Sequence, residues 1–132
     1  MADLLLRDVA LPDGRRGLDV LVRGGRIEAI GPRLPAPEGI PTEDGACQLL
    51  APSFVDPHFH MDATLSYGLP RVNASGTLLE GIALWGELKP ELTQEAIAER
   101  ALAYCDWAVA RGLLAIRTHV DVCDDRLLAV EA

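Results

Sequence analysis

Alternating apolar positions predict short β-strands in the first fifty residues. Apolar residues dominate positions 4–9, and a longer alternating stretch over 18–30 is interrupted by Gly24-Gly25. A glycine pair between two alternating runs predicts a β-hairpin, because a two-residue turn of the primed type needs positive φ. Four prolines break residues 31–45, which we expect to be a surface connection. Two or three strands alone bury too little to be stable, so this β-unit could be part of a sandwich and is expected to need a partner.

From Leu49 onward the pattern changes to an alternation of strands and helices. The apolar run over 49–55 predicts a strand buried on both faces, with a bend at Pro52. A helix is predicted after Thr77, with Glu80 in capping-box relation to it, because apolar residues then recur at helical spacing. We expect this helix to end at the next proline.

The alternation repeats once more before the sequence ends. A second helix is predicted from Thr93 to Gly112, a second strand starts at 113 and runs toward 121, and another helix opens near Asp124. This order indicates parallel strands joined by crossover helices, which is the α/β class. Two strands make neither a barrel nor an open sheet, so we expect an architecture truncated after its second strand.

Composition and charge narrow the choice of partner. The 132 residues are 49% hydrophobic and 24% charged, which is a globular balance. A net charge of -8 repels phosphate backbones and anionic lipid, which argues against nucleic-acid and membrane partners and favours a small-molecule substrate. No apolar run approaches the roughly 18 to 20 residues that span a bilayer, and no basic segment precedes the first apolar run. We therefore expect a cytoplasmic protein.

The candidate chemistry centres on His58 and His60, which follow the predicted strand directly. Side chains at i and i+2 of a strand point to one face, so both imidazoles are placed to bind one metal ion. A His-x-His pair also arises by chance and is weak by itself. Its place at the carboxyl end of a strand strengthens the metal hypothesis, because α/β enzymes put their sites there.

Longer stretches resemble a known family. Residues 54–62, Phe-Val-Asp-Pro-His-Phe-His-Met-Asp, resemble the first-strand signature of the amidohydrolase superfamily, and residues 75–82 and 117–122 resemble cytosine deaminase and its close relatives. The resemblance implies that residues 1–50 are the N-terminal strands of a small β-sandwich domain. It also implies that residues 51–132 begin a (β/α)₈ TIM barrel that holds one divalent metal ion, iron or zinc. It also implies hydrolytic release of ammonia from a nucleobase-like ring, with the metal lowering the pKa of a bound water.

The same resemblance suggests roles for six residues. By position, His58 and His60 match the two first-strand metal ligands. Asp62 is expected either to orient a histidine or to cap a loop or helix, and Leu78 matches a residue near the substrate pocket but also fits a helix core. At the end of the second strand, His119 and Asp121 are expected to face the barrel mouth. His119 is expected to bond the substrate or to support the two ligands; direct metal ligation and a hydrogen-bonded core histidine are the alternatives.

The family's remaining site residues have no counterpart in this sequence. These are a third histidine ligand, an acid/base glutamate and histidine pair, and an aspartate ligand, so no catalytic residue is assigned, and the metal needs further ligands. We expect the chain alone to be inactive. Three interpretations stay open: a fragment of a longer deaminase, a short non-catalytic structural or interaction module, and a chain that assembles with another supplying the missing strands. Isoguanine, creatinine-like and aminotriazine rings are alternative substrates to cytosine, and the family allows a homo-oligomer.

Overall fold

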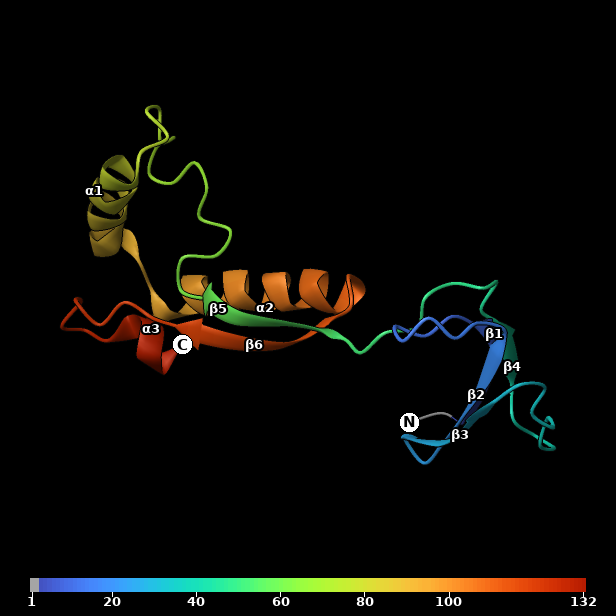
Figure 1. Ribbon diagram of the computed structural model, residues 1–132. Helices are drawn as coiled ribbons and strands as arrows, with labels where there is room; N and C mark the ends of the chain where they lie inside the picture. The colour runs from blue at the N-terminus through green and yellow to red at the C-terminus, as the bar shows by residue number, and fades with distance from the viewer. Residues whose placement is uncertain (1–2) are drawn as a thin grey trace. The chain divides into compact units, whose positions relative to one another are not determined.

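The computed structural model describes residues 3–132, and the chain divides into two compact units, Met1–Pro52 and Ser53–Ala132. The first unit is a four-stranded sheet, whereas the second combines a two-stranded sheet with helices (Figure 1). The protein is therefore mixed α/β, as the sequence predicts.

The strands of the first unit lie in the order β3-β2-β1-β4, with bounds β1 Leu4–Val9, β2 Leu18–Arg23, β3 Arg26–Gly31 and β4 Thr42–Asp44. The first three strands are antiparallel neighbours, and β4 runs parallel to β1. Apolar side chains of β1 and β2 form the core of this sheet, and the most deeply buried are Leu5, Val9 and Val20.

The predicted hairpin is confirmed. Arg23 pairs with Arg26, so that Gly24 and Gly25 alone form the turn between β2 and β3. Both glycines have positive φ, 55° and 74°, which a two-residue turn of the primed type requires.

Residues 31–45 lie at the surface, as expected, but their end forms a short strand, β4, that the sequence does not predict. Gly45 makes this pairing possible: its N–H donates to the Arg7 carbonyl at 2.7 Å. A Cβ at this position would lie 2.6 Å from Cγ1 of Val9, so the close approach of the two segments excludes a side chain. A pairing between segments so far apart leaves no local signal in a Pro-rich stretch.

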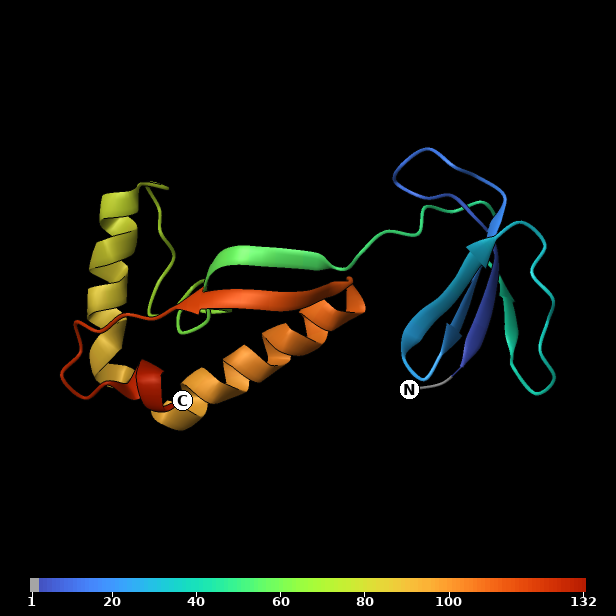
Figure 2. The same cartoon turned by 60° about the horizontal axis from the view of Figure 1, so that its bottom comes forward.

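The second unit contains two parallel strands joined through helices, with bounds β5 Phe54–His60, α1 Leu78–Leu88, the 3₁₀ helix η1 Lys89–Glu91, α2 Gln94–Ala110, β6 Leu113–His119 and α3 Leu128–Glu131. Helix α2 lies along the β5–β6 pair, and α1 stands beyond the carboxyl ends of both strands (Figures 1 and 2). Buried Leu88, Leu92 and Ile97 form a core where α1, η1 and α2 meet.

Both long helices begin where the sequence predicts. The hydroxyls of Thr77 and Thr93 accept hydrogen bonds from the N–H groups three residues later, which satisfies free donors of each first turn. Helix α1 ends before Pro90, and α2 ends before Gly112, whose φ is 79°. The last predicted helix is present as the single turn α3.

The predicted strand over 49–55 is wrong in both position and burial. Leu49 forms only an isolated bridge to Ala10 in the first unit, and the strand starts at Phe54 instead. Phe54 and Val55 are 69% and 62% exposed, so this strand is not covered on both faces within the described residues. The apolar run spans the boundary between two units, and periodicity alone does not show where one unit ends.

Among residues 3–132, the structure contains no helix that is long and apolar enough to cross a membrane.

Candidate metal-binding site

Three histidines converge at the carboxyl ends of the two parallel strands. The ring centroids of His58 and His60 lie 5.6 Å apart, and the ring of His119 lies 4.2 Å from the first and 5.7 Å from the second. The register explains this meeting, because His60 of β5 pairs with His119 of β6. Residues paired in neighbouring strands put their side chains on the same face of a sheet. The structure thus brings His119 to the predicted pair.

Local irregularity in β5 sets the position of the first histidine. The β5–β6 register shifts between Asp56 and Phe59, where Pro57 lacks an N–H to donate to the ladder. The N–H of His58 donates to the Asp56 carboxylate at 3.0 Å instead of to a strand. On the helix side, Phe59 stacks on Tyr104 of α2 with a centroid distance of 4.3 Å. Because side chains alternate along a strand, Phe59 lies on the face of β5 toward α2, and the histidines lie on the other face.

The segment that follows β5 is tied to β6 and to α2. The N–H of Met61 donates to Oγ1 of Thr118 at 3.0 Å, and the N–H of Asp121 donates to Oδ2 of Asp62 at 2.7 Å. From α2, the Arg100 guanidinium donates to the carbonyl of Asp62 at 3.2 Å and to that of Thr64 at 3.1 Å. These bonds hold the ends of both strands together beyond the regular ladder.

Asp62 is the buried member of this arrangement. The residue is only 3% exposed, and its Oδ1 accepts a hydrogen bond from the N–H of Ala63 at 2.9 Å. The same oxygen lies 4.0 Å from Nδ1 of His60, whose side chain is 57% exposed. The structure thus places Asp62 next to a predicted ligand, where it also accepts hydrogen bonds from the N–H groups of two loop residues; its role in orienting a histidine stays a prediction.

Asp121 lies beyond the end of β6, and its carboxylate points to helix α1. Oδ2 accepts hydrogen bonds from Nε1 of Trp85 at 2.7 Å and from Nζ of Lys89 at 2.6 Å, while Oδ1 accepts from the N–H of Cys123 at 2.7 Å. The Lys89 ammonium holds the pKa of Asp121 well below its usual range. The carboxylate is therefore ionised, and both of its oxygens already have partners.

His119 differs from its two neighbours in electrostatic setting. Partial burial lowers its pKa from the ordinary value, and the adjacent His58 and His60 lower it further because a second positive charge would be repelled there. A lowered pKa favours the neutral imidazole, the form that binds metal ions or accepts a hydrogen bond.

Leu78 lies apart from the histidines, at the first position of α1. Its side chain is 79% exposed, so the alternative of a helix-core leucine is wrong for this chain. The exposure has a local cause: α1 buries its other face, through Leu84 and Leu88. The proposed place near a substrate pocket stays a prediction.

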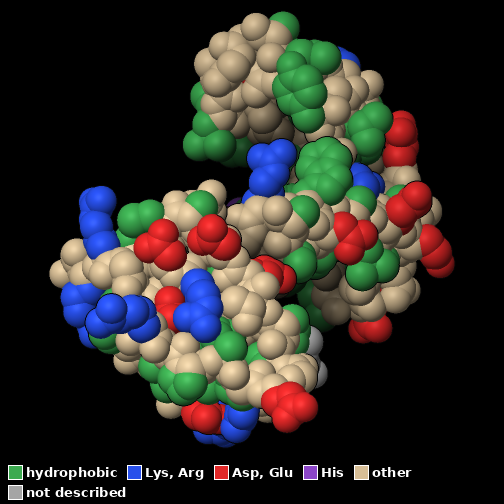
Figure 3. Space-filling model, turned by 90° about the vertical axis from the view of Figure 1, so that its right-hand side faces the viewer, with side chains coloured by type: hydrophobic (Ala, Val, Ile, Leu, Met, Phe, Trp, Pro, Cys, Tyr) green, Lys and Arg blue, Asp and Glu red, His purple; other side chains and the backbone are tan. Residues whose placement is uncertain are grey.

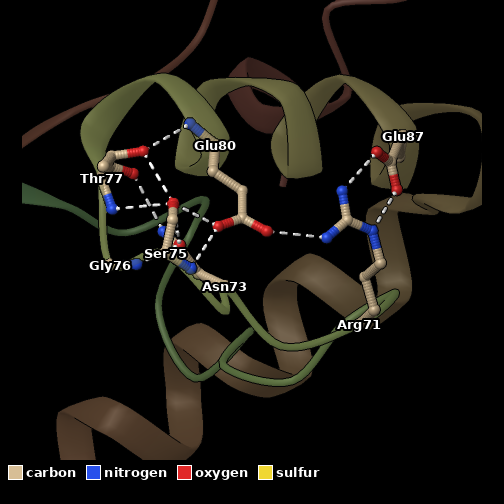
Figure 4. Close-up of polar contacts among 7 residues, drawn as sticks. All are labelled: Arg71, Asn73, Ser75, Gly76, Thr77, Glu80 and Glu87. Carbon is tan, nitrogen blue, oxygen red and sulfur yellow. Dashed lines mark hydrogen bonds and ion pairs between the residues drawn. The ribbon is translucent and has the colours of Figure 1, made fainter.

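The segment before α1 is held by a network of polar side chains (Figure 4). Thr77 caps the helix as predicted, but the Glu80 carboxylate accepts from the N–H of Ser75 at 2.6 Å, so the reciprocal half of the capping box is displaced by two residues. Arg71 donates to Glu80 at 2.9 Å and forms two bonds to Glu87. Hydrogen bonds from Ser75, and then from Arg71, lower the pKa of Glu80 to about 2.

Two open cavities adjoin the histidines. One of about 520 Å³ lies between the end of β5 and helix α2, where Tyr104 and Trp107 form part of its wall. The other, of about 320 Å³, is bounded by His60, Asp62, Trp85 and Asp121, with Ala63 and Val120. The second has the size of a small heterocycle site. Hydrophobic side chains also reach the surface, as the green groups in Figure 3 show; Leu114 and Trp107 are both 63% exposed.

Comparison with known proteins identifies the family. The sequence profile of the amidohydrolase family matches residues 48–132. The chain belongs to the amidohydrolase family. A solved structure of 5-methylcytosine deaminase from Klebsiella pneumoniae superposes with a TM-score of 0.85 and 35% identity over 97% of this chain and 31% of that one. The predicted superfamily membership is thereby confirmed.

Two further relatives show the range of amidohydrolases to which the chain is similar. N-isopropylammelide isopropylaminohydrolase from Burkholderia multivorans has a TM-score of 0.77 and 32% identity, with 99% of this chain and 33% of that one covered. N-acyl-D-aspartate deacylase from Alcaligenes xylosoxydans xylosoxydans is 44% identical over 69 residues, which are 48% of this chain and 14% of the relative. The chain therefore spans about a third of the solved amidohydrolases and a smaller share of this curated relative.

The amidohydrolase chain does not complete a metal centre by itself. Within residues 3–132, no group of three His, Cys, Asp or Glu side chains is placed to hold one metal ion, although three imidazole rings are close together. His58 and His60 offer the nitrogen donors that zinc and iron accept, and they fit part of a coordination sphere.

Three residues of this amidohydrolase site are missed by the sequence argument: Trp85, Arg100 and Thr118. The sequence does contain a sign that Arg100 is partly buried, because it lies three residues after buried Ile97 and four before Tyr104, on the helix face toward the sheet. A charged residue on such a face needs buried partners, and here they are backbone carbonyls. Trp85 and Thr118 carry no comparable signal, because their partners are distant in the sequence.

Proposed function

We propose that this chain contributes the first part of the metal site of a deaminating amidohydrolase, which hydrolyses the C–N bond between a ring carbon and its exocyclic amino group in a cytosine-like substrate and releases ammonia. The convergence of the histidine rings at the carboxyl ends of two paired parallel strands carries the proposal. The likeness to 5-methylcytosine deaminase supports the substrate class. On this proposal β5 and β6 are the first two strands of a (β/α)₈ barrel.

His58 and His60 would hold one divalent metal ion, iron or zinc, together with ligands from outside these residues. Such an ion acts as a Lewis acid and lowers the pKa of water in a hydrolytic site. The chain's own residues supply the surroundings. Trp85 and Val120 border the cavity beside His60, where a planar ring would lie against apolar surface. His119 accepts or donates one hydrogen bond to the substrate or supports the two ligands.

Metal binding is the first test. Zn²⁺ is titrated into the ¹⁵N-labelled chain while the imidazole resonances are followed, and we expect His58 and His60 to shift together. The double variant His58→Ala, His60→Ala should lose the response. His119→Ala separates the roles: a large fall in affinity makes His119 a ligand, and a small one leaves it a supporting residue. Zn²⁺ binding that is unchanged in the double variant would refute the metal site.

Activity is the second test. The chain alone should release no ammonia from cytosine, because two imidazoles cannot fix a metal with an open, oriented water position. The protein encoded by the complete reading frame should release ammonia from cytosine or 5-methylcytosine, and His60→Ala should abolish this. A complete protein that releases ammonia from neither ring but hydrolyses an acylamino acid would replace deamination by deacylation.

A further inference from the structure

Two side chains of one helix face donate to the same carboxylate oxygen at the end of β6. Trp85 of α1 and Lys89, the residue at the end of this helix, are four residues apart, so their side chains share one face. Nε1 of Trp85 donates to Oδ2 of Asp121 at 2.7 Å, and Nζ of Lys89 lies 2.6 Å from the same oxygen. A charged acceptor makes the indole bond stronger than a bond between neutral groups. The carboxylate therefore ties this face of α1 to the strand end.

The carboxylate of Asp121 is itself held by backbone groups on the strand side. Its Oδ1 accepts a hydrogen bond from the N–H of Cys123 at 2.7 Å, and the N–H of Asp121 donates to the buried Asp62 carboxylate, also at 2.7 Å. Neither bond involves α1. Asp121 is thus the fixed member of the contact, and the indole of Trp85 takes its position from it.

The indole of Trp85 lies between a helix core and the cavity beside His60. Its ring packs against the core where α1, η1 and α2 meet, and it also borders the cavity of about 320 Å³ together with His60 and Val120. An indole N–H that is partly buried needs an acceptor, which Asp121 provides. Packing on one side and a hydrogen bond at Nε1 are two points of attachment, and together they set the plane of the ring.

We propose that Asp121 is a positioning residue that holds the indole of Trp85 as a rigid wall of this cavity, against which a planar substrate ring lies. The identity of the substrate rests on the proposed function, whereas the control of the indole by Asp121 does not. Both oxygens of Asp121 already have donors, so this carboxylate acts through Trp85 and not by its own contact with the substrate. A shift of α1 away from the end of β6 would move the wall.

The attachment of the indole is measured in the chain as it exists. Each of the two tryptophans gives one indole N–H signal in a ¹H–¹⁵N spectrum, and Trp107→Phe assigns them. The N–H of Trp85 should exchange with solvent more slowly than that of Trp107, which is 63% exposed. Asp121→Ala should accelerate this exchange roughly 10-fold or more, the effect of losing a hydrogen bond to a charged group. A wild-type Trp85 N–H that exchanges as fast as that of Trp107 overturns the proposal, whether or not the variant folds.

Asp124→Ala is the matched control. Asp124 belongs to the same segment, is partly buried like Asp121, and accepts hydrogen bonds from the guanidinium of Arg126. Its loss removes an ion pair but no acceptor of the indole, so the Trp85 N–H should keep its exchange rate. Equal acceleration in Asp124→Ala and Asp121→Ala would make the effect a general loosening of the segment and overturn the proposal.

Kinetics of the protein encoded by the complete reading frame test the wall itself. Trp85→Ala should raise KM for cytosine roughly 3- to 10-fold, the contribution of one aromatic contact, and leave kcat nearly unchanged, because a wall binds the substrate and the transition state alike. Asp121→Ala should raise KM by no more than this, and the double variant should be no worse than Trp85→Ala. Additive effects, or an unchanged KM in both single variants, would overturn the proposal.

The two experiments also separate this inference from the proposed function. A complete protein that deaminates neither cytosine nor 5-methylcytosine refutes the proposed function. Slow exchange of the Trp85 N–H that is lost in Asp121→Ala and kept in Asp124→Ala still supports the control of the indole by Asp121. Deamination with normal kinetics in Asp121→Ala overturns the positioning role and leaves the proposed function standing.

Discussion

Replacement of Phe59 by alanine tests whether β5 is held against α2 through its aromatic contact. Phe59 lies between the two histidines and is partly buried, and its ring stacks on Tyr104 with 13° between the ring planes. A fully buried Phe→Ala change costs roughly 3 to 5 kcal/mol, and a stacked pair adds about 0.5 to 1.5 kcal/mol to its area burial. For a partly buried ring we expect a loss of about 2 kcal/mol in the free energy of unfolding of the second unit.

The assay follows this unit selectively. All helices of residues 3–132 lie within Ser53–Ala132, so the helical circular dichroism band reports on its unfolding. With a urea dependence of about 1 to 2 kcal/mol per molar, the midpoint of Phe59→Ala should fall by about 1 to 2 M. Phe54→Ala is the matched control, because Phe54 lies in the same strand but is 69% exposed; its midpoint should hardly move.

Two results would refute this reasoning. Equal losses in Phe54→Ala and Phe59→Ala would mean that burial against α2 does not distinguish the two aromatic residues. An unchanged midpoint in Phe59→Ala would mean that the stack contributes nothing to holding the strand that carries the histidines.

Three further perturbations have defined outcomes. Leu88→Ala should destabilise the second unit by about 2 to 4 kcal/mol, because this side chain is 5% exposed, while Leu79→Ala, at 79% exposure, should change the urea midpoint little. Acid should loosen the segment before α1, because the pKa of Glu80 is lowered from 4.5 to about 2 in the folded chain. The stabilisation by the Glu80 carboxylate is complete above pH 4.5 and is lost as the pH falls toward 2. Hydrogen exchange of the Ser75 N–H, which donates to this carboxylate, measures the change. Asp121→Asn should lower the stability of the second unit by about 1 to 2 kcal/mol, since the Trp85 indole and the Lys89 ammonium lose a charged acceptor; an unchanged urea midpoint would contradict a contribution of these contacts.

The candidate site shows which residues of a site a local sequence pattern can predict. The pair His58 and His60 follows from strand periodicity, and the resemblance over 54–62 supplies the family that the comparison confirms. The position of His119 beside this pair cannot be predicted from strand periodicity, because it depends on the register between β5 and β6 across a long connection. A shift of one residue in that register would turn the third ring to the other face of the sheet.

The same division holds for Asp62. The sequence offers two roles for it, but the burial of its carboxylate and the hydrogen bond from a residue 59 positions away are seen only in the structure. Thr118 carries no local signal for the same reason, since it accepts a hydrogen bond from a backbone N–H far along the chain.

By itself the sequence determined those features that are stabilised by interactions between residues close together in the chain. Positive φ at Gly24 and Gly25 fixes the hairpin, and the hydroxyls of Thr77 and Thr93 fix the starts of the two long helices. Only the tertiary structure decided where β5 begins, how β4 joins its sheet, and which side chains meet at the end of β6. Those outcomes depend on backbone pairing and burial between distant segments, which the hydrophobic periodicity of a single segment does not indicate.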